Sequence, residues 1–452
     1  MGSRVAIVVF FVFILAGFAI EAQGRKKVTL AVWLPLFWII ICASRSINQW
    51  LNLSSFDSYT YISSFSEEDY IAGHVSGSPV DQIVLSIAIA CGILIIYKRR
   101  EAAAGVFKNN KALLAFIIYL GISVLWSDIT GGSFRRWARL IGHFVMAAVL
   151  LTESNPLESV RSVFRRTAYL LIPLSVMFIK YIPQIGILYS GLGMPIWAGA
   201  SLMKNGLGHL CFVSSFCLVW DAIGSWGRKE RMKFPRAIFD MIIVMMCLWL
   251  LRGSQSAASI GSLIFGIAML IGSRVPTIKR GFGRIGTLVI VAVCLVLVLE
   301  SSFGISKVIV TGLGRDETYT GRMPLWNTLL ELGLKRPFLG YGYEGFWIGE
   351  RNSIEGLNQA HNGYLEIFVE GGLVAIILLG VLLVSVFRKI QRGGLSDYGY
   401  AVFRLSLLAM ILLANVTESS FARDRDLLTF VFFIIAMNDA APSGNVRTLA
   451  PN

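Results

Sequence analysis

The residues best suited to chemistry are a histidine and an arginine in one long polar segment. His361 stands in the sequence Ala-His-Asn-Gly-Tyr-Leu-Glu, where a helix is expected to begin. A neutral imidazole there could take the proton of an attacking hydroxyl, and the helix N-terminus would favour a nearby anion. Arg322 lies upstream in the same segment. We predict that both are catalytic and share one substrate. The alternative for His361 is a packing or capping role.

Other basic residues fall in loops and at helix ends on the side of the membrane where orientation rules disfavour them. Arginine grips phosphate oxygens with two parallel hydrogen bonds, whereas lysine acts as a point charge. A lipid-linked pyrophosphate at the membrane surface would explain the whole set, although each residue alone could instead snorkel to the interface. The predicted pyrophosphate ligands are Arg135, Arg136, Lys204, Arg252 and Arg315.

Aromatic and polar residues near His361 are candidates for holding sugar rings. We predict glycan contacts for Trp326, Tyr343, Glu344 and Asn362. Aromatic belts at membrane interfaces produce the same enrichment in rings. A solvated carboxylate is the simpler interpretation of Glu344.

The elements that must position these residues are apolar runs that recur along all 452 residues. The chain is 55% hydrophobic and 15% charged, whereas soluble domains average about 25% charged residues. A helix needs about 20 apolar residues to cross about 30 Å of hydrocarbon, and one soluble core could not bury so many runs. The sequence predicts an all-α polytopic membrane protein with about 12–13 transmembrane helices. The runs are 5–20, 28–43, 82–97, 112–126, 140–151, 168–178, 206–220, 237–251, 260–271, 285–299, 365–386, 405–415 and 427–437.

The distribution of lysine and arginine orients these spans. With the most basic loops in the cytoplasm, the N-terminus lies outside and the C-terminus inside. We predict three parts. Residues 1–299 form an N-terminal transmembrane bundle, residues 300–364 form a large periplasmic loop with short helices, and residues 365–452 form the C-terminal spans and a cytoplasmic tail.

The predicted periplasmic loop contains its own helix signals. A helical pattern follows Arg322 and is ended by Pro337, and glycines from Gly340 onward predict a turn region. A second helix is expected to start near Asn362, and Gly371-Gly372 marks a break before the next span. We expect this helical loop to cap the active cavity.

Composition argues against several other kinds of site. The six cysteines all lie in apolar runs without metal-ligand spacing, so we predict neither a zinc site nor a disulfide framework. The net charge of +14 sits in short loops, which indicates membrane topology rather than a nucleic-acid surface. We expect no metal, no cofactor and no nucleic-acid partner.

Several short motifs, taken in order, resemble those of the O-antigen ligase and exopolysaccharide polymerase superfamily, over residues 28–437. The strongest are Gly314-Arg315-Asp316, Thr320-Gly321-Arg322, Pro337–Gly342 and His361-Asn362-Gly363-Tyr364. Weaker ones are Trp126-Ser127-Asp128 before Arg135-Arg136, Lys204–Gly208, and Ser254–Ala257.

The resemblance implies a membrane-embedded, metal-independent glycosyltransferase in the bacterial inner membrane. In that family periplasmic arginines grip undecaprenyl pyrophosphate and a loop histidine serves the acceptor hydroxyl. Arg322 and His361 match those positions best, and Arg136 and Lys204 match less closely. The implied partners are an undecaprenyl-pyrophosphate glycan, an acceptor glycan and the lipid bilayer, with a flippase and a chain-length regulator as further candidates.

Three functions remain open at this point. We favour a polymerase that builds exopolysaccharide from lipid-linked repeat units, because Ala257 stands near the place where ligases usually have an arginine. The alternative is an O-antigen ligase that transfers polysaccharide to lipid A-core, with Arg252 as a substitute for that arginine. A secondary transporter is the non-enzymatic rival, and Asp240 within a span is its best feature.

Overall fold

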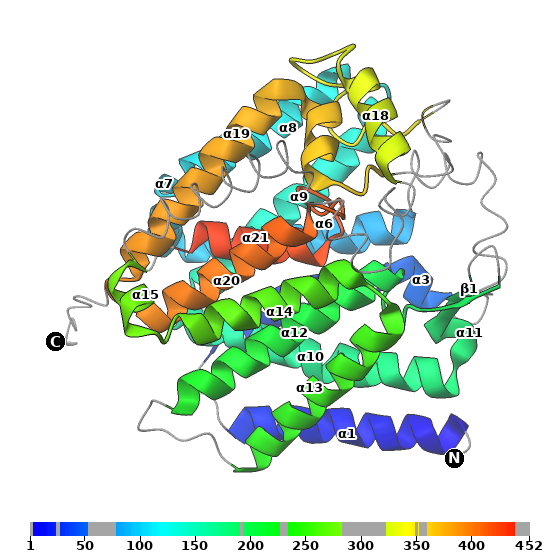
Figure 1. Ribbon diagram of the computed structural model, residues 1–452, viewed down its shortest axis with the longest axis vertical. Helices are drawn as coiled ribbons and strands as arrows, with labels where there is room; N and C mark the ends of the chain where they lie inside the picture. Colours follow the sequence, from blue (N-terminus) through cyan, green and yellow to red (C-terminus); the bar gives the residue numbers. More distant parts are fainter. Residues whose placement is uncertain are drawn as a thin grey trace.

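The computed structural model describes residues 3–23, 28–52, 78–189, 193–226, 234–282, 322–348, 351 and 359–438. These residues form helices joined by short connections (Figure 1). Two three-residue strands pair antiparallel, with Ile187 opposite Trp197. The predicted all-α polytopic fold is confirmed.

The helices and strands fall into two groups along the chain. The elements up to the strands are α1 (Ser3–Gln23), η1 (Leu30–Val32), α2 (Trp33–Ala43), α3 (Ile47–Leu51), α6 (Pro79–Lys98), α7 (Arg100–Lys108), α8 (Lys111–Ser123), η3 (Val124–Trp126), α9 (Thr130–Leu151), α10 (Pro156–Tyr181), α11 (Pro183–Gly186), β1 (Ile187–Tyr189) and β2 (Pro195–Trp197). The later elements are α12 (Lys204–Trp226), α13 (Phe234–Ser254), α14 (Ala257–Gly272), α15 (Pro276–Arg280), α18 (Arg322–Gly333), α19 (Gly363–Gly393), α20 (Tyr398–Ala414) and α21 (Leu427–Met437).

Among the described residues, six helices are long and apolar enough to cross a membrane: α1, α6, α10, α12, α13 and α19. The segment from α7 through α8 to η3 forms a further candidate that is bent by 82°. Four more apolar helices are shorter. All the predicted apolar runs fall on helices except 285–299, which lies outside the described residues. The protein is thus a multi-pass membrane protein, and the total of about 12–13 spans stays a prediction.

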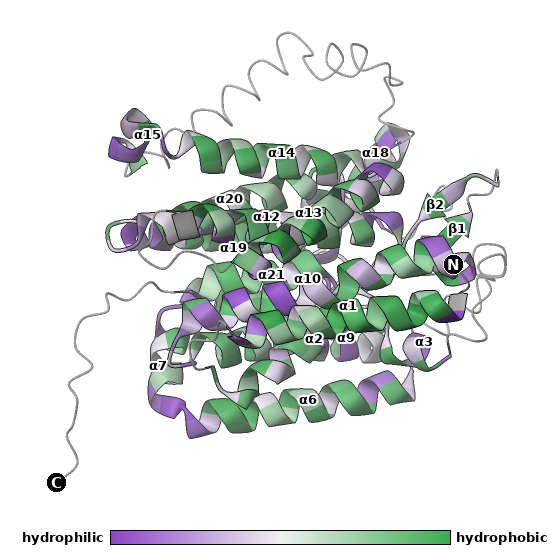
Figure 2. Cartoon of the chain, turned by 90° about the horizontal axis from the view of Figure 1, so that it is seen from below, coloured by the Kyte–Doolittle hydropathy of each residue, from purple (hydrophilic) through white to green (hydrophobic). Residues whose placement is uncertain are grey.

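The two ends of the helix bundle differ in their loops. In both views α7 and α15 lie at one end, and α3, α18 and β1 lie at the other (Figures 1 and 2). The first end carries basic residues such as Lys108, Lys111, Lys279 and Arg280. By the positive-inside rule we expect that end to face the cytoplasm. The helix that begins at Arg322 belongs to the opposite end.

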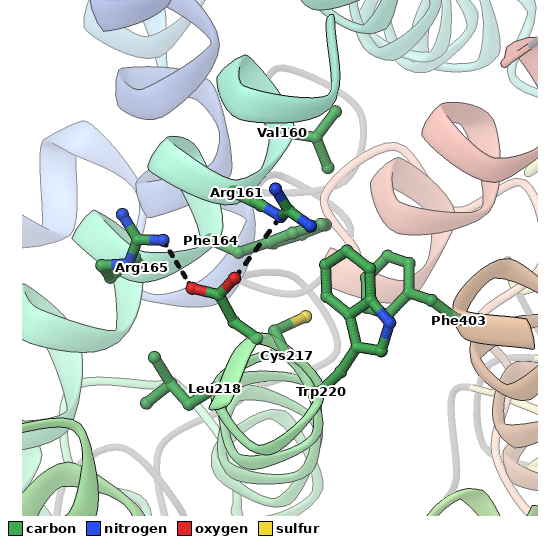
Figure 3. A pocket seen from close by; sticks show the side chains of 9 residues that line it. Val160, Arg161, Phe164, Arg165, Cys217, Leu218, Trp220 and Phe403 are labelled. Atoms are coloured by element: carbon green, nitrogen blue, oxygen red, sulfur yellow. Dashed lines mark hydrogen bonds and ion pairs between the residues drawn. The ribbon is translucent and has the colours of Figure 1, made fainter. Parts of the chain in front are cut away.

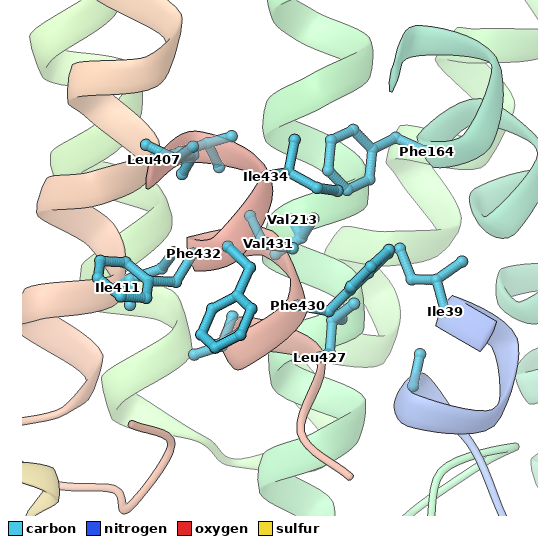
Figure 4. Packing of buried hydrophobic residues seen from close by; sticks show 14 of the residues in the cluster. Ile39, Phe164, Val213, Leu407, Ile411, Leu427, Phe430, Val431, Phe432 and Ile434 are labelled. Carbon is cyan, nitrogen blue, oxygen red and sulfur yellow. The ribbon is translucent and has the colours of Figure 1, made fainter. Parts of the chain in front are cut away.

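The short helix α21 lies in the centre of the bundle. Every residue from Leu427 to Met437 is buried. Figure 4 shows its side chains among residues of α2, α10, α12 and α20, including Ile39, Phe164 and Val213. A helix that is apolar on all sides needs packing partners on all sides. The end of the loop that precedes α21 therefore lies inside the bundle.

Helix α19 begins where the sequence predicts. The Oδ1 atom of Asn362 accepts hydrogen bonds from the backbone N–H groups of Tyr364 and Leu365, both at 3.1 Å. The predicted break is also confirmed, because Gly372 has a φ of +63°. A Cβ at this position would lie 2.2 Å from the carbonyl oxygen of Phe338, so only glycine fits. The break separates the first turns of α19 from its long apolar remainder.

Candidate functional site

The richest group of charged residues lies in the loop between α20 and α21, residues 415–426, here called the α20–α21 loop. Glu418 in this loop is 5% exposed. A buried charge is tolerated only when it is paired or hydrogen-bonded. The charged side chains of the loop accordingly contact residues from segments that are far away in the sequence.

Glu418 joins the two residues predicted to be catalytic. Its Oε1 lies 3.3 Å from Nη2 of Arg322, and its Oε2 lies 3.5 Å from Nδ1 of His361. Asn205 donates a hydrogen bond of 2.7 Å to the same Oε2. Arg322 also donates to the backbone carbonyl of Thr417. The predicted proximity of Arg322 and His361 is confirmed, because both contact one carboxylate. Their catalytic roles stay a prediction.

The surroundings of Glu418 keep this carboxylate ionised. Burial by itself raises the pKa of Glu418, but contact with His361 and the nearby charges of His209, His361 and Arg322 outweigh burial and hold the pKa below its ordinary value. A carboxylate facing Nδ1 of His361 favours the tautomer that carries its proton on that nitrogen. The other ring nitrogen, Nε2, is then the one that can accept a proton.

Backbone strain concentrates around the α20–α21 loop. Among the described residues other than glycine, positive φ values occur at Gln255 (53°), Glu344 (51°), His361 (47°) and Ala422 (56°). Such conformations cost about 1–3 kcal/mol each, and they cluster at active sites and ligand clamps. Ala422 belongs to the loop, and Glu344 and His361 each contact one of its side chains. This distribution makes the loop a candidate functional site.

A second cluster centres on Arg423 of the same loop. Its guanidinium lies 2.9 Å from Glu344, 2.6 Å from Glu366 and 4.0 Å from Glu370. Arg136 of α9 donates a hydrogen bond of 2.8 Å to the backbone carbonyl of Glu344 and lies 3.6 Å from its carboxylate. A predicted pyrophosphate ligand is thus paired with a predicted glycan contact.

Glu366 connects the two clusters. It accepts hydrogen bonds from the indole of Trp347 at 2.5 Å, from the backbone N–H of Ala360 at 2.6 Å and from the hydroxyl of Ser419 at 2.9 Å. Ala360 and Ser419 are the direct neighbours of His361 and of the carboxylate that it contacts. One buried carboxylate therefore fixes the backbone on both sides of the histidine–glutamate contact.

A cavity of about 220 Å³ opens beside Glu418. Its walls come from the end of α2, from α3, from the start of α12 and from the α20–α21 loop, and they include Asn205 and Gln359. The amide nitrogen of Gln359 lies 3.5 Å from Nε2 of His361. The nitrogen suited to accept a proton is therefore next to a residue of the cavity wall. Within the described part of the chain, no group of His, Cys, Asp and Glu side chains could hold a metal ion.

The other predicted pyrophosphate ligands have different surroundings. Lys204 is exposed at the first position of α12, between two residues that line the cavity. Arg135 is half-buried on α9, and Arg252 is exposed in the last turn of α13. Arg315 lies outside the described residues. The structure thus places Lys204 at the edge of the cavity.

Three of the predicted glycan contacts form hydrogen bonds with the backbone around the site. Tyr343 is 1% exposed, and its hydroxyl donates to the backbone carbonyl of Ala422 at 2.5 Å. The indole of Trp326 donates to the carbonyl of Ala360 at 2.9 Å, and Asn362 caps α19. These geometries favour a positioning role over direct contact with a sugar, and glycan binding by these residues stays a prediction.

Glu418 and Arg423 were not singled out from the sequence. The run Arg423-Asp424-Arg425-Asp426 places four charges in a row between two apolar runs. Membrane topology requires no acidic residues there, and charges so close to hydrocarbon are costly. The four consecutive charged residues were therefore the feature of the sequence that could have identified this loop.

These observations define a helical multi-pass membrane protein with a polar site at one end. Residues 241–380 match a family model described as O-antigen ligase. The chain is also similar to the exopolysaccharide production protein ExoQ of Rhizobium meliloti (strain 1021), with 26% identity over 321 residues, which are 68% of this chain and 70% of that protein. The two matches confirm the resemblance to the O-antigen ligase and exopolysaccharide polymerase superfamily. The matched family range contains Arg322 and His361 and ends before the α20–α21 loop.

Proposed function

We propose that this protein polymerises undecaprenyl-pyrophosphate-linked oligosaccharide repeat units into exopolysaccharide at the periplasmic face of the bacterial inner membrane. Similarity to an exopolysaccharide production protein and the multi-pass fold support this proposal. The observation that carries it is the convergence of Arg322 and His361 on buried Glu418, beside a cavity of about 220 Å³.

In the proposed reaction a hydroxyl of the acceptor sugar attacks the anomeric carbon of the donor sugar. Nε2 of His361 takes the hydroxyl proton as the new glycosidic bond forms. The bond between the anomeric carbon and the pyrophosphate oxygen breaks, and undecaprenyl pyrophosphate leaves with the electron pair. Arg322 stabilises the charge that develops on the leaving group, and Glu418 stabilises the imidazolium.

The remaining basic residues extend the phosphate site in this proposal. Lys204 stands at the cavity edge, while Arg135, Arg252 and Arg315 contribute to capture of the anionic donor. Arg136, which contacts Glu344 in the neighbouring cluster, also contributes to this phosphate site. The donor is already activated by its pyrophosphate, so the scheme uses no metal and no nucleotide. A flippase would supply the donor, and a chain-length regulator would set the product length.

A gene deletion distinguishes polymerisation from ligation. A polymerase deletion leaves single repeat units on the lipid carrier and no long polysaccharide. The second candidate, an O-antigen ligase, is favoured by the description of the matched family. Its deletion leaves long polymer on the carrier that never reaches lipid A-core. Analysis of carrier-linked glycans by mass spectrometry separates the two outcomes.

Complementation of the deletion tests the role of the arginine. Arg322→Lys keeps the positive charge but loses the paired hydrogen bonds to phosphate, so it should restore little polymer. Full polymer yield from Arg322→Lys would contradict the proposed grip on pyrophosphate.

A further inference from the structure

A groove at the end of the molecule that carries α7 and α15 is lined by basic and apolar side chains. It lies between α19 and the bend that joins α7 to α8, and its volume is about 880 Å³. No acidic residue is among the described residues that line it. No acidic side chain among the described residues that line the groove therefore balances its positive charge. Its basic residues are Lys108, Lys111, Arg388, Lys389 and Arg392.

All but one of these basic residues are available to a ligand. Apart from Lys389 they are exposed, and none of them forms an ion pair within the described part of the chain. Lys389 is different, because its Nζ donates to Oδ1 of Asn110 at 2.6 Å and to the carbonyl of Ala436 at 3.2 Å. This lysine ties α19 to the α7–α8 bend and so fixes one wall of the groove.

An apolar stripe on α19 forms the other part of the groove. Ile377, Val381 and Val384 are 63%, 54% and 48% exposed, and they recur at helical spacing. Gly380 lies among them, with open space where a Cβ would stand. The stripe leads along the helix to Arg388, one turn beyond Val384. A stripe of this kind on a membrane-spanning helix suits an acyl chain.

The bend between α7 and α8 places the basic residues at one depth. The two helices meet at 82°, and α8 belongs to a candidate membrane span. Helix α7 therefore runs roughly along the membrane surface, as interfacial helices do. Lys108 and Lys111 flank the bend, and this position corresponds to the level of lipid headgroups.

We propose that this groove binds an anionic diacyl phospholipid of the bilayer. The headgroup phosphate would lie on Lys108, Lys111, Arg388 and Arg392, and one acyl chain would follow the apolar stripe of α19. Basic pockets between transmembrane helices on the cytoplasmic side recognise anionic headgroups in this way. The proposal is independent of the proposed transfer reaction, since it uses none of the residues around Glu418.

Lipid retention by the full chain tests the proposal. The protein is incorporated in nanodiscs that hold equal amounts of phosphatidylglycerol and phosphatidylcholine, and the lipids that remain bound are identified by native mass spectrometry. The groove variant is Lys108→Gln, Lys111→Gln, Arg388→Gln and Arg392→Gln. The matched control is Lys98→Gln, Arg274→Gln, Lys279→Gln and Arg280→Gln, which removes the same charge outside the groove.

We expect the native chain and the matched control to retain phosphatidylglycerol in preference to phosphatidylcholine. The groove variant should bind phosphatidylglycerol at least about tenfold more weakly, because it removes the four exposed charges proposed to contact the headgroup phosphate, whereas the control removes charges outside the groove. Equal loss in the control variant, retention by the groove variant, or no preference in the native chain would each overturn the proposal. Preferential displacement of phosphatidylglycerol by undecaprenyl phosphate would also overturn it, because the occupant would then be a polyprenyl carrier.

A second variant tests the groove without changing its charge. Gly380→Leu places a side chain in the groove, at a position where an added Cβ meets nothing within 4 Å. Phosphatidylglycerol binding should fall at least about threefold while the thermal unfolding temperature is unchanged, as expected when an acyl chain loses apolar contact area. Unchanged lipid binding in this variant would rule out the acyl-chain position proposed here.

Discussion

Two buried networks of charged residues differ in the room beside them. Toward the end that we expect to be cytoplasmic, Asp221 of α12 lies 2.8 Å from Arg165 and 3.5 Å from Arg161, the two arginines labelled in Figure 3. Asp221 also contacts Arg236. The cavity beside that network measures about 10 Å³. The cavity beside Glu418 measures about 220 Å³. Both networks pair buried charges, but the cavity is much larger beside the one around Glu418.

The two networks also differ in the backbone that carries them. The residues around Asp221 lie on the regular helices α10, α12 and α13. In the network around Glu418, a loop residue contacts His361, which has a positive φ, and residues in the first turns of α18 and α12. Asp240, the feature that favoured a transporter, belongs to the first network, where it lies 3.6 Å from Arg236 and accepts a hydrogen bond from Tyr169. Charge inside a membrane bundle is therefore weak evidence for a site unless a cavity and backbone strain accompany it.

The largest expected effect is the loss of activity in Glu418→Gln. The substitution keeps the size of the side chain but removes the charge that orients His361, so polymer yield per folded molecule should fall at least about 100-fold. Yield is measured in the deletion strain and normalised to membrane-inserted protein. The matched control Asp221→Asn should stay within a few-fold of the native yield. Equal losses in both variants would remove the functional distinction between the networks.

The next largest expected effect is on stability. Here Asp221→Asn should lose more than Glu418→Gln. Asp221→Asn removes the carboxylate that three arginines share, and breaking a buried ion pair costs about 3–5 kcal/mol. Its thermal unfolding temperature in detergent should therefore fall clearly. Glu418→Gln should be less destabilising, because water in the adjacent cavity can solvate its partners. A lower unfolding temperature for Glu418→Gln than for Asp221→Asn would contradict this comparison of the two networks.

A smaller effect is expected from the strained backbone of the α20–α21 loop. Ala422 has a φ of +56°, which a β-branched side chain adopts poorly. Ala422→Val should lower the stability of the protein by about 1–3 kcal/mol, and Ala422→Gly should not lower it by more than a few tenths. Denaturation of the purified protein measures both changes. Equal stability of the valine and glycine variants would show that the loop can relax this conformation at no cost.

The smallest effect is the pH dependence of stability. Burial raises the pKa of Asp424, but the charges of Arg139, Arg425, Arg136 and His143 outweigh burial and lower it to about 2, and the pKa of Glu418 is also held below its ordinary value. A carboxyl with a depressed pKa stabilises the fold above its ordinary pKa of about 4, and this stabilisation is lost as the pH falls through the lowered value.

These two carboxyls should therefore make the unfolding temperature fall as the pH drops below about 4. Glu418→Gln should weaken that fall, because one of the titrating carboxyls is gone. An equal fall below about pH 4 in the native chain and in Glu418→Gln would contradict this assignment.

Much of the secondary structure could be predicted because its causes are local. Apolar runs of suitable length, the helix that begins at Arg322, the cap at Asn362 and the break at Gly372 follow from residues within a few positions of one another. The proximity of Arg322 and His361 could also be predicted, because both residues lie in one polar segment and in motifs that resemble those of the family. Composition and spacing by themselves determined the fold class, and the family resemblance added the motifs that single out Arg322 and His361.

Only the tertiary structure decided which buried charges are partners. Arg322 and Glu418 are 96 positions apart, and Arg136 and Glu344, to which the sequence assigned separate roles, form one pair. Tyr343, a predicted glycan contact, is buried, and its hydroxyl donates to the backbone carbonyl of Ala422. The physical reason is that a buried charge takes whichever opposite charge the packed helices bring within reach, and this packing depends on contacts between segments that are distant in the sequence.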